Sequence, residues 1–190
     1  DRIQVLYNGI PLDEIRTMPP EWVAQFRREH GVEPEDRVLG IVGRMEIFKG
    51  HIDSFRALQT VQKRMPRVFL WVIGDGIYEP ELKKWVVDHR MDDSIRFLGF
   101  RRDVREVIQC LDVQLFPSHH EGTPNTLYEA LAVGNVILAA RIDGQAEILE
   151  DNHTALMFDA GDSEAIAARI LKVLQDPGLA VSLRAAALTR

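Results

Sequence analysis

The chain has 190 residues, of which 46% are hydrophobic, and its formal net charge at pH 7 is -6. This length and composition suffice for one sizeable core, so the chain fits a single domain or one half of a larger protein, and the acidic balance argues against a nucleic-acid surface. The one cysteine excludes a disulfide framework and indicates a reducing compartment, and no apolar run approaches the ~18 residues of a membrane span.

Short apolar runs alternate with helical patterns along the whole chain. Few polar residues interrupt the apolar runs, as expected for strands that are covered on both faces. Because strand and helix alternate, the sequence predicts an α/β fold with a doubly wound, mainly parallel sheet. The strands are predicted at residues 3–7, 37–42, 68–73, 95–98, 113–116, 136–140 and 155–158. The helices are predicted at residues 20–30, 51–65, 80–90, 104–110, 125–133, 145–149, 163–175 and 177–187.

Two cations and two glycines lie where the predicted strand at 37–42 turns into the next helix. They belong to the stretch Gly43-Arg44-Met45-Glu46-Ile47-Phe48-Lys49-Gly50. In an open α/β sheet, ligands bind at the carboxyl ends of the strands, so Arg44 and Lys49 are predicted to face a ligand crevice there. Arginine grips phosphate oxygens as a fork, and lysine adds a mobile charge. The alternative is a simple turn at Lys49 and a surface ion pair at Arg44.

Residues 121–129, which read Glu-Gly-Thr-Pro-Asn-Thr-Leu-Tyr-Glu, open an apolar helical run. Thr123 is predicted to cap this helix and Pro124 to suit its first turn. The amides that would then project from the helix N-terminus are those of Asn125, Thr126 and Leu127. Such an end binds anions, because a phosphate there meets unpaired donors and the positive end of the helix dipole.

Two glutamates flank that helix start, with seven residues between them. Glu121 lies just before the helix and Glu129 lies inside it. Carboxylates accept hydrogen bonds from hydroxyl groups, so the pair is suited to hold a sugar and a ribose on either side of a diphosphate. The alternative is a helix with two solvated glutamates.

Histidine and cysteine offer weaker signals. His119 and His120 do not read as a metal site, because adjacent side chains diverge and no further ligand has suitable spacing; a place in the wall of the site is expected instead. Cys110 lies in an apolar helical run and is interpreted as a packed thiol, not a nucleophile.

In its motifs, the whole chain resembles the C-terminal, donor-binding domain of the retaining glycosyltransferases with the glycosyltransferase-B fold, the large family called group 1 or family 4. The resemblance covers nearly all 190 residues and keeps the family's order. The motifs that carry it are Asn8-Gly9-Ile10, Gly43-Arg44 with Lys49-Gly50, Gly74-Asp75-Gly76, Leu98-Gly99-Phe100, Pro117-Ser118, the paired glutamates, Gly134, and Asp143-Gly144 with Glu147.

The resemblance implies a role for each matching position. Arg44 and Lys49, beside Gly43, would neutralise the donor diphosphate, and Glu121 would contact hydroxyls of the transferred sugar. Glu129 would hold the ribose hydroxyls. The other implied donor contacts are the base contacts of Phe100 and Arg101 and the backbone around Gly122, Thr123, Pro124, Asn125, Thr126 and Leu127.

The resemblance also implies a function for the whole. Residues 1–190 would be a single nucleotide-sugar-binding domain, the C-terminal half of a cytoplasmic enzyme whose N-terminal domain is missing here. The missing N-terminal domain would hold a glycan, lipid or small-molecule acceptor. Any peripheral association with the inner face of the membrane would come through that domain. The full enzyme would transfer the sugar with retention and without a metal or other cofactor, and the fragment alone would be inactive. The residues by themselves leave open a non-catalytic module that binds a sugar nucleotide or phosphate, and a sugar-nucleotide epimerase.

The chain departs from the family pattern at a few positions. The family often has two adjacent glycines where this chain has Asp143-Gly144, and a proline where it has Asn135. Asn135 is expected to affect the stiffness of its loop more than the chemistry. Neither change removes a proposed ligand contact.

Overall fold

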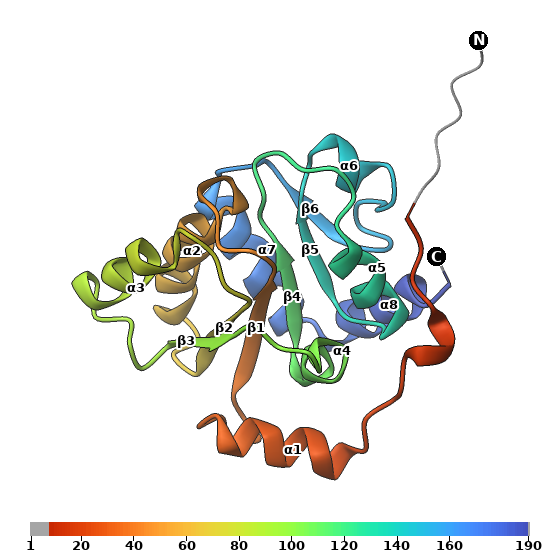
Figure 1. The fold of residues 1–190 in the computed structure, drawn as a ribbon, viewed down its shortest axis with the longest axis horizontal. Helices are drawn as coiled ribbons and strands as arrows, with labels where there is room; N and C mark the ends of the chain where they lie inside the picture. Colours follow the sequence, from red (N-terminus) through yellow and green to blue (C-terminus); the bar gives the residue numbers. More distant parts are fainter. Residues whose placement is uncertain (1–7, 190) are drawn as a thin grey trace.

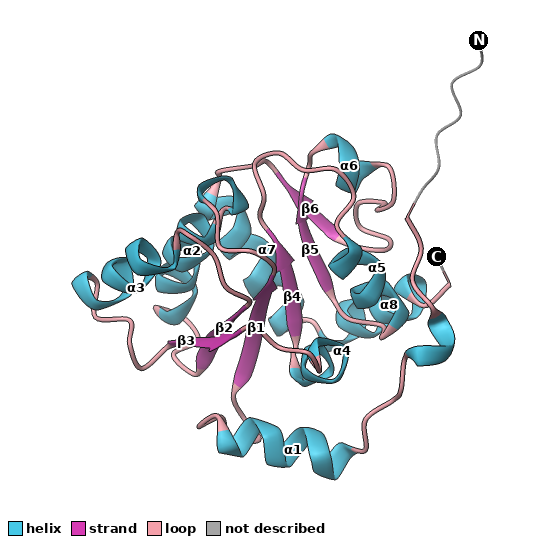
Figure 2. Cartoon of the chain, in the orientation of Figure 1, coloured by secondary structure: helices cyan, strands magenta, loops and turns pink. Residues whose placement is uncertain are grey.

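Six parallel strands form one sheet in the order β3-β2-β1-β4-β5-β6, in a computed structural model that describes residues 8–189 (Figures 1 and 2). The strands are β1 Arg37–Val42, β2 Val68–Ile73, β3 Ile95–Gly99, β4 Val113–Phe116, β5 Ile137–Ala140 and β6 Leu156–Phe158. The predicted doubly wound, parallel α/β fold is therefore confirmed. The strand predicted at residues 3–7 lies outside the described residues. The chain reverses its direction of travel across the sheet between β1 and β4, and ligands of such sheets bind at the carboxyl ends of the strands at this switch point.

The helices follow the predicted pattern with a few changes at their ends. They are α1 Pro20–Glu29, α2 His51–Gln62, α3 Glu79–Asp88, α4 Val104–Val107, α5 Asn125–Ala132, α6 Asp143–Ala146, α7 Ser163–Gln175 and α8 Pro177–Ala187. Short 3-10 turns lie at Leu12–Glu14, Ile47–Lys49 and Ile108–Cys110. The helix predicted at 104–110 is thus split into α4 and a 3-10 turn, and α6 begins two residues before the predicted start at 145. None of the described helices has the length and apolarity that crossing a membrane requires.

Alternate residues of the strands feed cores on opposite faces of the sheet. On β1, Leu39 packs with Phe55 of α2 and with residues of α3 and α7, whereas Val38 packs with Phe26 of α1 and with residues of α4. A third cluster joins α5 to β5 and β6 on the same side as α1. Cys110 is buried in the α1 cluster, and burial raises the pKa of its thiol to about 12, so the predicted packed thiol is confirmed.

Asn135 does more than the predicted adjustment of loop stiffness. Its side chain is buried, and Nδ2 donates hydrogen bonds to the carbonyl of Ile108 at 3.0 Å and to Oε1 of Gln114 at 2.9 Å. The amide therefore connects the loop before β5 to β4 and to the 3-10 turn after α4. A proline, which lacks this side chain and a backbone N–H, could not make these bonds or the one that Asn135 N–H makes to Ala130 O.

Gly50 lies just before α2 and allows the turn between β1 and α2 to pack against the loop that follows β4. Its φ is +69°, and a Cβ at this position would lie 2.1 Å from the carbonyl oxygen of Pro117. A bond from His119 N–H to the carbonyl of Phe48 at 2.8 Å joins the same two segments. Only glycine satisfies both the left-handed backbone and the close approach.

Replacing Gly50 tests how much this approach matters, and Gly99 provides a matched control. Gly99 has φ +67°, but nothing lies within 4 Å of a Cβ built on it. We expect Gly99→Ala to lower the free energy of unfolding by about 1–2 kcal/mol through backbone strain alone, and Gly50→Ala by a further ~1–3 kcal/mol through the clash with backbone atoms. Equal losses for both variants in urea unfolding would show that the contact with Pro117 contributes nothing.

Candidate functional site

The carboxyl ends of β1 and β4 open onto a cavity of about 360 Å³ at the switch point. It is bounded by the end of β1 and the turn after it, the first residue of α2, the loop after β4 and the start of α5. The lining residues are Ile41, Val42, Gly43, Arg44, Lys49, His51, Leu115, Phe116, Pro117, Ser118, Glu121, Pro124, Asn125 and Thr126. Two segments that are about 80 positions apart in sequence are therefore brought to one place by the pairing of β1 with β4.

The cavity collects part of the predicted site. The predicted residues that line it are Gly43, Arg44, Lys49, Glu121, Pro124, Asn125 and Thr126. Those that do not are Phe100, Arg101, Gly122, Thr123, Leu127 and Glu129. The cations and two of the three residues whose amides were predicted to bind phosphate thus share one crevice, and the groups predicted to hold base and ribose lie outside it.

Lys49 and Glu121 form an ion pair within the cavity. Lys49 Nζ contacts Glu121 Oε1, and the two side chains are 17% and 18% exposed. Ser118 Oγ donates to Glu121 Oε2 at 2.9 Å, which holds the carboxylate from its other side. A lysine ammonium has three N–H donors, so one bond to Glu121 leaves two that can reach a ligand anion.

Arg44 is more exposed than Lys49, the other cation of the cavity. Its side chain is 76% exposed, and its guanidinium lies 3.0 Å from Oε1 of Glu46. Arg44 was interpreted either as a cation that faces a ligand crevice or as a surface ion-pair partner. The structure combines the two, since Arg44 lines the cavity and also makes a surface ion pair. Exposed pairs contribute only about 0–1 kcal/mol, so little would oppose the arginine's turning toward an anion.

The start of α5 differs from the prediction. The N-cap is Pro124 and no side chain caps the helix. Thr123 lies one residue before the N-cap, and its Oγ1 donates to the carbonyl of Gly144 at 3.0 Å. The N–H of Leu127 donates to the carbonyl of Pro124 at 3.0 Å, and its side chain is in the core. Of the three amides predicted to face an anion, those of Asn125 and Thr126 therefore remain, and the prediction of a free amide at Leu127 is wrong.

Gly144 lies close to the backbone of the loop before α5. A Cβ on Gly144 would lie 2.4 Å from the carbonyl carbon of Gly122, so α6 packs directly on the loop that carries Glu121. Asp143, which stands where the family often has its other glycine, is exposed. The chain therefore keeps glycine at position 144, where the packing requires it, and departs from the family pattern at the exposed position 143.

Glu129 is held by an arginine that sequence reasoning missed. Arg105 of α4 donates from Nε to Glu129 Oε1 at 3.0 Å and from a terminal nitrogen to Glu14 Oε2 at 2.7 Å. These two carboxylates raise the pKa of the Arg105 guanidinium above its usual range. Arg105 is 24 residues from Glu129 in sequence, and no local pattern marks the contact.

The residues predicted to lie near a base are found after β3. Phe100 is 69% exposed, which leaves its ring available as a surface. Arg101 forms a fork with Asp103, at 2.8 Å and 2.6 Å, and lies 5.2 Å above the ring of Phe26. The hydrogen bonds from Arg101 hold the pKa of the Asp103 carboxyl below its usual range.

His119 and His120 diverge as predicted but do not line the cavity, so the expected place in its wall is wrong. His119 Nε2 lies 2.6 Å from Asp53 Oδ2 of α2, and His120 stacks on Phe48 with ring centroids 4.8 Å apart. In the part of the chain that the structure describes, no group of three or more histidine, cysteine, aspartate or glutamate side chains is arranged to bind a metal ion.

His51 lines the cavity and was also missed, although it follows Lys49-Gly50 directly. It is the first residue of α2, it is 2% exposed, and neither ring nitrogen has a hydrogen-bond partner within residues 8–189. Burial, and then the neighbouring charge of Lys49, lower the pKa of its imidazole to about 4. His51 is therefore neutral at pH 7.

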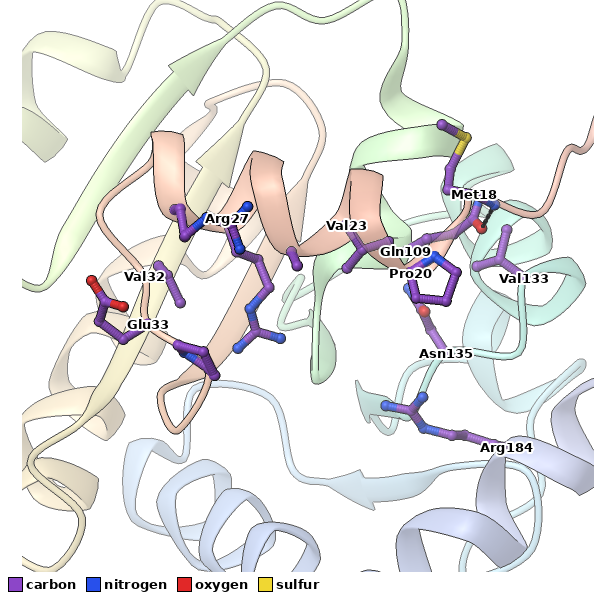
Figure 3. Close-up of a pocket in the computed structure, with 13 residues that line it drawn as sticks. Met18, Pro20, Val23, Arg27, Val32, Glu33, Gln109, Val133, Asn135 and Arg184 are labelled. Carbon is purple, nitrogen blue, oxygen red and sulfur yellow. Dashed lines mark hydrogen bonds between the residues drawn. The ribbon is translucent and has the colours of Figure 1, made fainter.

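A second cavity, of about 430 Å³, lies at the opposite, amino-terminal edge of the sheet and is shown in Figure 3. Arg27 of α1 and Arg184 of α8 enter it from different walls (Figure 3). Arg27 donates to the carbonyl of Asp36 at 2.8 Å and lies 3.2 Å from Asp112 Oδ2, and Arg184 donates to the carbonyl of Asp112 at 3.3 Å. These guanidinium groups fasten the helices to the sheet, so the position and bonding of this cavity do not suit an anionic substrate.

Comparison with known proteins shows what the chain as a whole is similar to. A family model described as "Glycosyl transferases group 1" matches residues 23–190. The lipopolysaccharide core biosynthesis glycosyltransferase LpsE of Rhizobium meliloti (strain 1021) is 32% identical over 161 residues, which cover 85% of this chain and 46% of that protein. The chain spans about half the length of the curated relatives it matches.

Two solved structures share its fold. HepE of Anabaena, in complex with UDP and glucose, has a TM-score of 0.91 at 24% identity, and the match covers 98% of this chain and 51% of that one. The C-terminal domain of the group 1 glycosyl transferase LpcC from Francisella tularensis has a TM-score of 0.80 at 24% identity over 95% of both chains.

The buried imidazole of His51 predicts a pH dependence of stability. Its pKa is about 4 in the folded chain and 6.5 unfolded, so the unfolded state binds the proton first and stability falls as the pH falls from 6.5 toward 4. Between pH 7 and pH 5 we expect the free energy of unfolding to drop by about 2 kcal/mol more in the unmodified chain than in His51→Gln. Identical pH profiles in urea unfolding would show that His51 titrates normally.

Proposed function

Since the chain belongs to the group 1 glycosyl transferases, we propose that it is the donor-binding domain of an enzyme that transfers a sugar from a nucleoside diphosphate sugar to an acceptor. The observation that carries the proposal is the cavity at the switch point, where Lys49, Arg44 and the first amides of α5 converge. Two cationic side chains and a helix N-terminus suit a diphosphate, even though the chain as a whole is acidic.

The proposal divides the enzyme into two parts. Residues 1–190 form one donor domain, and the rest of the protein holds the acceptor, a glycan, a lipid or a small molecule. The share of its relatives that the chain covers supports this division. A cytoplasmic location belongs to the same proposal, supported by the single, buried, unpaired cysteine. Because HepE was solved with UDP and with UDP-glucose, UDP-sugars are the first donors to test.

The positions outside the cavity fit a nucleoside that extends from it. Glu129 contacts Arg105, and Arg105 follows the proposed base-binding pair Phe100 and Arg101 by only four residues. A diphosphate in the cavity would thus lead to a ribose near Glu129 and a base near Phe100. The ribose hydroxyls would share the Glu129 carboxylate with Arg105, because a carboxylate can accept several hydrogen bonds.

The proposed chemistry is electrostatic. As the bond between the anomeric carbon and the diphosphate oxygen breaks, negative charge grows on the leaving group, and Lys49, Arg44 and the amides of Asn125 and Thr126 stabilise it. An acceptor hydroxyl forms the new bond to the anomeric carbon on the same face, and its proton passes to the departing diphosphate. Retention is included because the motif resemblance implies it, and no residue is assigned as a covalent nucleophile.

Glu121 has a defined place in this scheme. It would accept hydrogen bonds from hydroxyls of the transferred sugar while Lys49 turns its other N–H groups to the diphosphate. The pair would then connect the sugar to the leaving group. The cationic side chains already supply the counter-charge that a divalent metal supplies elsewhere, so we propose transfer without a metal or other cofactor.

The ion pair makes the affinity for UDP a sharp test. We expect Arg44→Ala to weaken UDP binding roughly tenfold, the loss of one charge-assisted hydrogen bond. Lys49→Ala should weaken it further, because Glu121 is then left uncompensated beside the diphosphate, and adding Glu121→Gln to Lys49→Ala should recover part of the loss. Calorimetry with the unmodified chain and these variants measures each step.

Arg64→Ala is the matched control, because Arg64 is exposed and lies outside the cavity, so its removal changes net charge alone. The same titrations with EDTA should give unchanged affinities. Binding that is equal in all variants would contradict the diphosphate site, and binding that needs added Mg²⁺ or Mn²⁺ would contradict metal independence.

A further inference from the structure

His51 is a buried polar group in the wall of the cavity. It is the first residue of α2, and it lines the cavity together with Lys49 and Ser118. Neither of its ring nitrogens has a hydrogen-bond partner among the described residues. Buried polar groups in folded proteins are nearly always paired, so an unpaired one in the wall of a ligand cavity points to a partner supplied by the ligand.

The electrostatic surroundings fix what this side chain can offer. Burial and the adjacent Lys49 ammonium both disfavour the imidazolium, so the ring is neutral at pH 7, with one N–H donor and one acceptor nitrogen. A neutral donor can contact a phosphate oxygen without a further positive charge beside Lys49. A hydrogen bond to an anionic acceptor is also stronger than one between neutral groups, and it strengthens as charge grows on the leaving group.

We propose that His51 is a donor-binding residue that gives one imidazole N–H to a phosphate oxygen of the nucleoside diphosphate sugar. This assignment rests on the proposed function of the cavity and adds a ligand contact to it. The diphosphate would then be held from three sides, by Lys49 and Arg44 after β1, by His51 at α2, and by the amides of Asn125 and Thr126 at α5.

A purely structural His51 would behave differently from a ligand contact. A packing residue depends on the shape of the ring, so His51→Phe would preserve its role and His51→Gln would not. A donor to phosphate depends on an N–H group, so the order reverses. Uridine, which has no phosphate, provides a ligand whose affinity a phosphate contact cannot affect.

The test measures UDP and uridine affinities by calorimetry for the unmodified chain, His51→Gln, His51→Phe and a control, His153→Phe. His153 is exposed and lies outside the cavity. We expect His51→Phe to bind UDP roughly tenfold more weakly, with uridine affinity unchanged, His51→Gln to retain more of the UDP affinity, and the control to match the unmodified chain. In spectra of the chain with ¹⁵N-labelled histidine, UDP and not uridine should shift the His51 ring nitrogens and bring one N–H signal into slow exchange.

The outcomes distinguish the role of His51 from the proposed function of the cavity. If the unmodified chain binds UDP, and neither the affinity in His51→Phe nor the histidine signals change, the role of His51 is wrong and the proposed function stands. Equal losses of UDP and uridine affinity in His51→Phe also overturn the role, because they report a distorted cavity. If the unmodified chain binds none of a panel of nucleoside diphosphates and their sugars, the proposed function fails, and the role of His51 fails with it.

Discussion

The site depends on one constraint, the close approach of Gly50 to the carbonyl of Pro117. The parallel pairing of β1 with β4 brings the ends of these strands together, and a glycine in a left-handed conformation lets the following turns touch. That contact places Lys49 within reach of Glu121, although the two are 72 residues apart. A Cβ at position 50 would overlap the carbonyl of Pro117, so a side chain there would push these two segments apart.

The ion pair of Lys49 and Glu121 then determines how charge is distributed in the cavity. In a chain with a net charge of -6, a binding site for a diphosphate needs local positive groups, yet an unpaired half-buried lysine would be unfavourable. Glu121 compensates Lys49 inside the protein, while Arg44 remains near the surface and His51 stays neutral. The lining therefore carries two cations, Arg44 and Lys49, against one carboxylate, Glu121, which leaves a positive charge for an anion.

Sequence patterns located what depends on local order, and they missed what depends on distant contacts. The bounds of β1 and α7 follow from apolar runs and helical periodicity, and the corner cations follow from their place after a strand. The cap predicted at Thr123 is wrong, because the helix begins one residue later than that prediction requires, and the partner of its hydroxyl, the carbonyl of Gly144, lies 21 residues away in sequence. Arg105 was missed for the same reason, since its two carboxylate partners come from remote segments.

The central claim is that a donor diphosphate occupies the cavity at the switch point, and a crystal structure of the chain with UDP-glucose tests it most directly. The account predicts phosphate oxygens within hydrogen-bond distance of Lys49 Nζ and of the amides of Asn125 and Thr126, with the glucose hydroxyls at Glu121. A nucleotide bound instead in the cavity between Arg27 and Arg184, with the switch point filled only by water, would contradict the account.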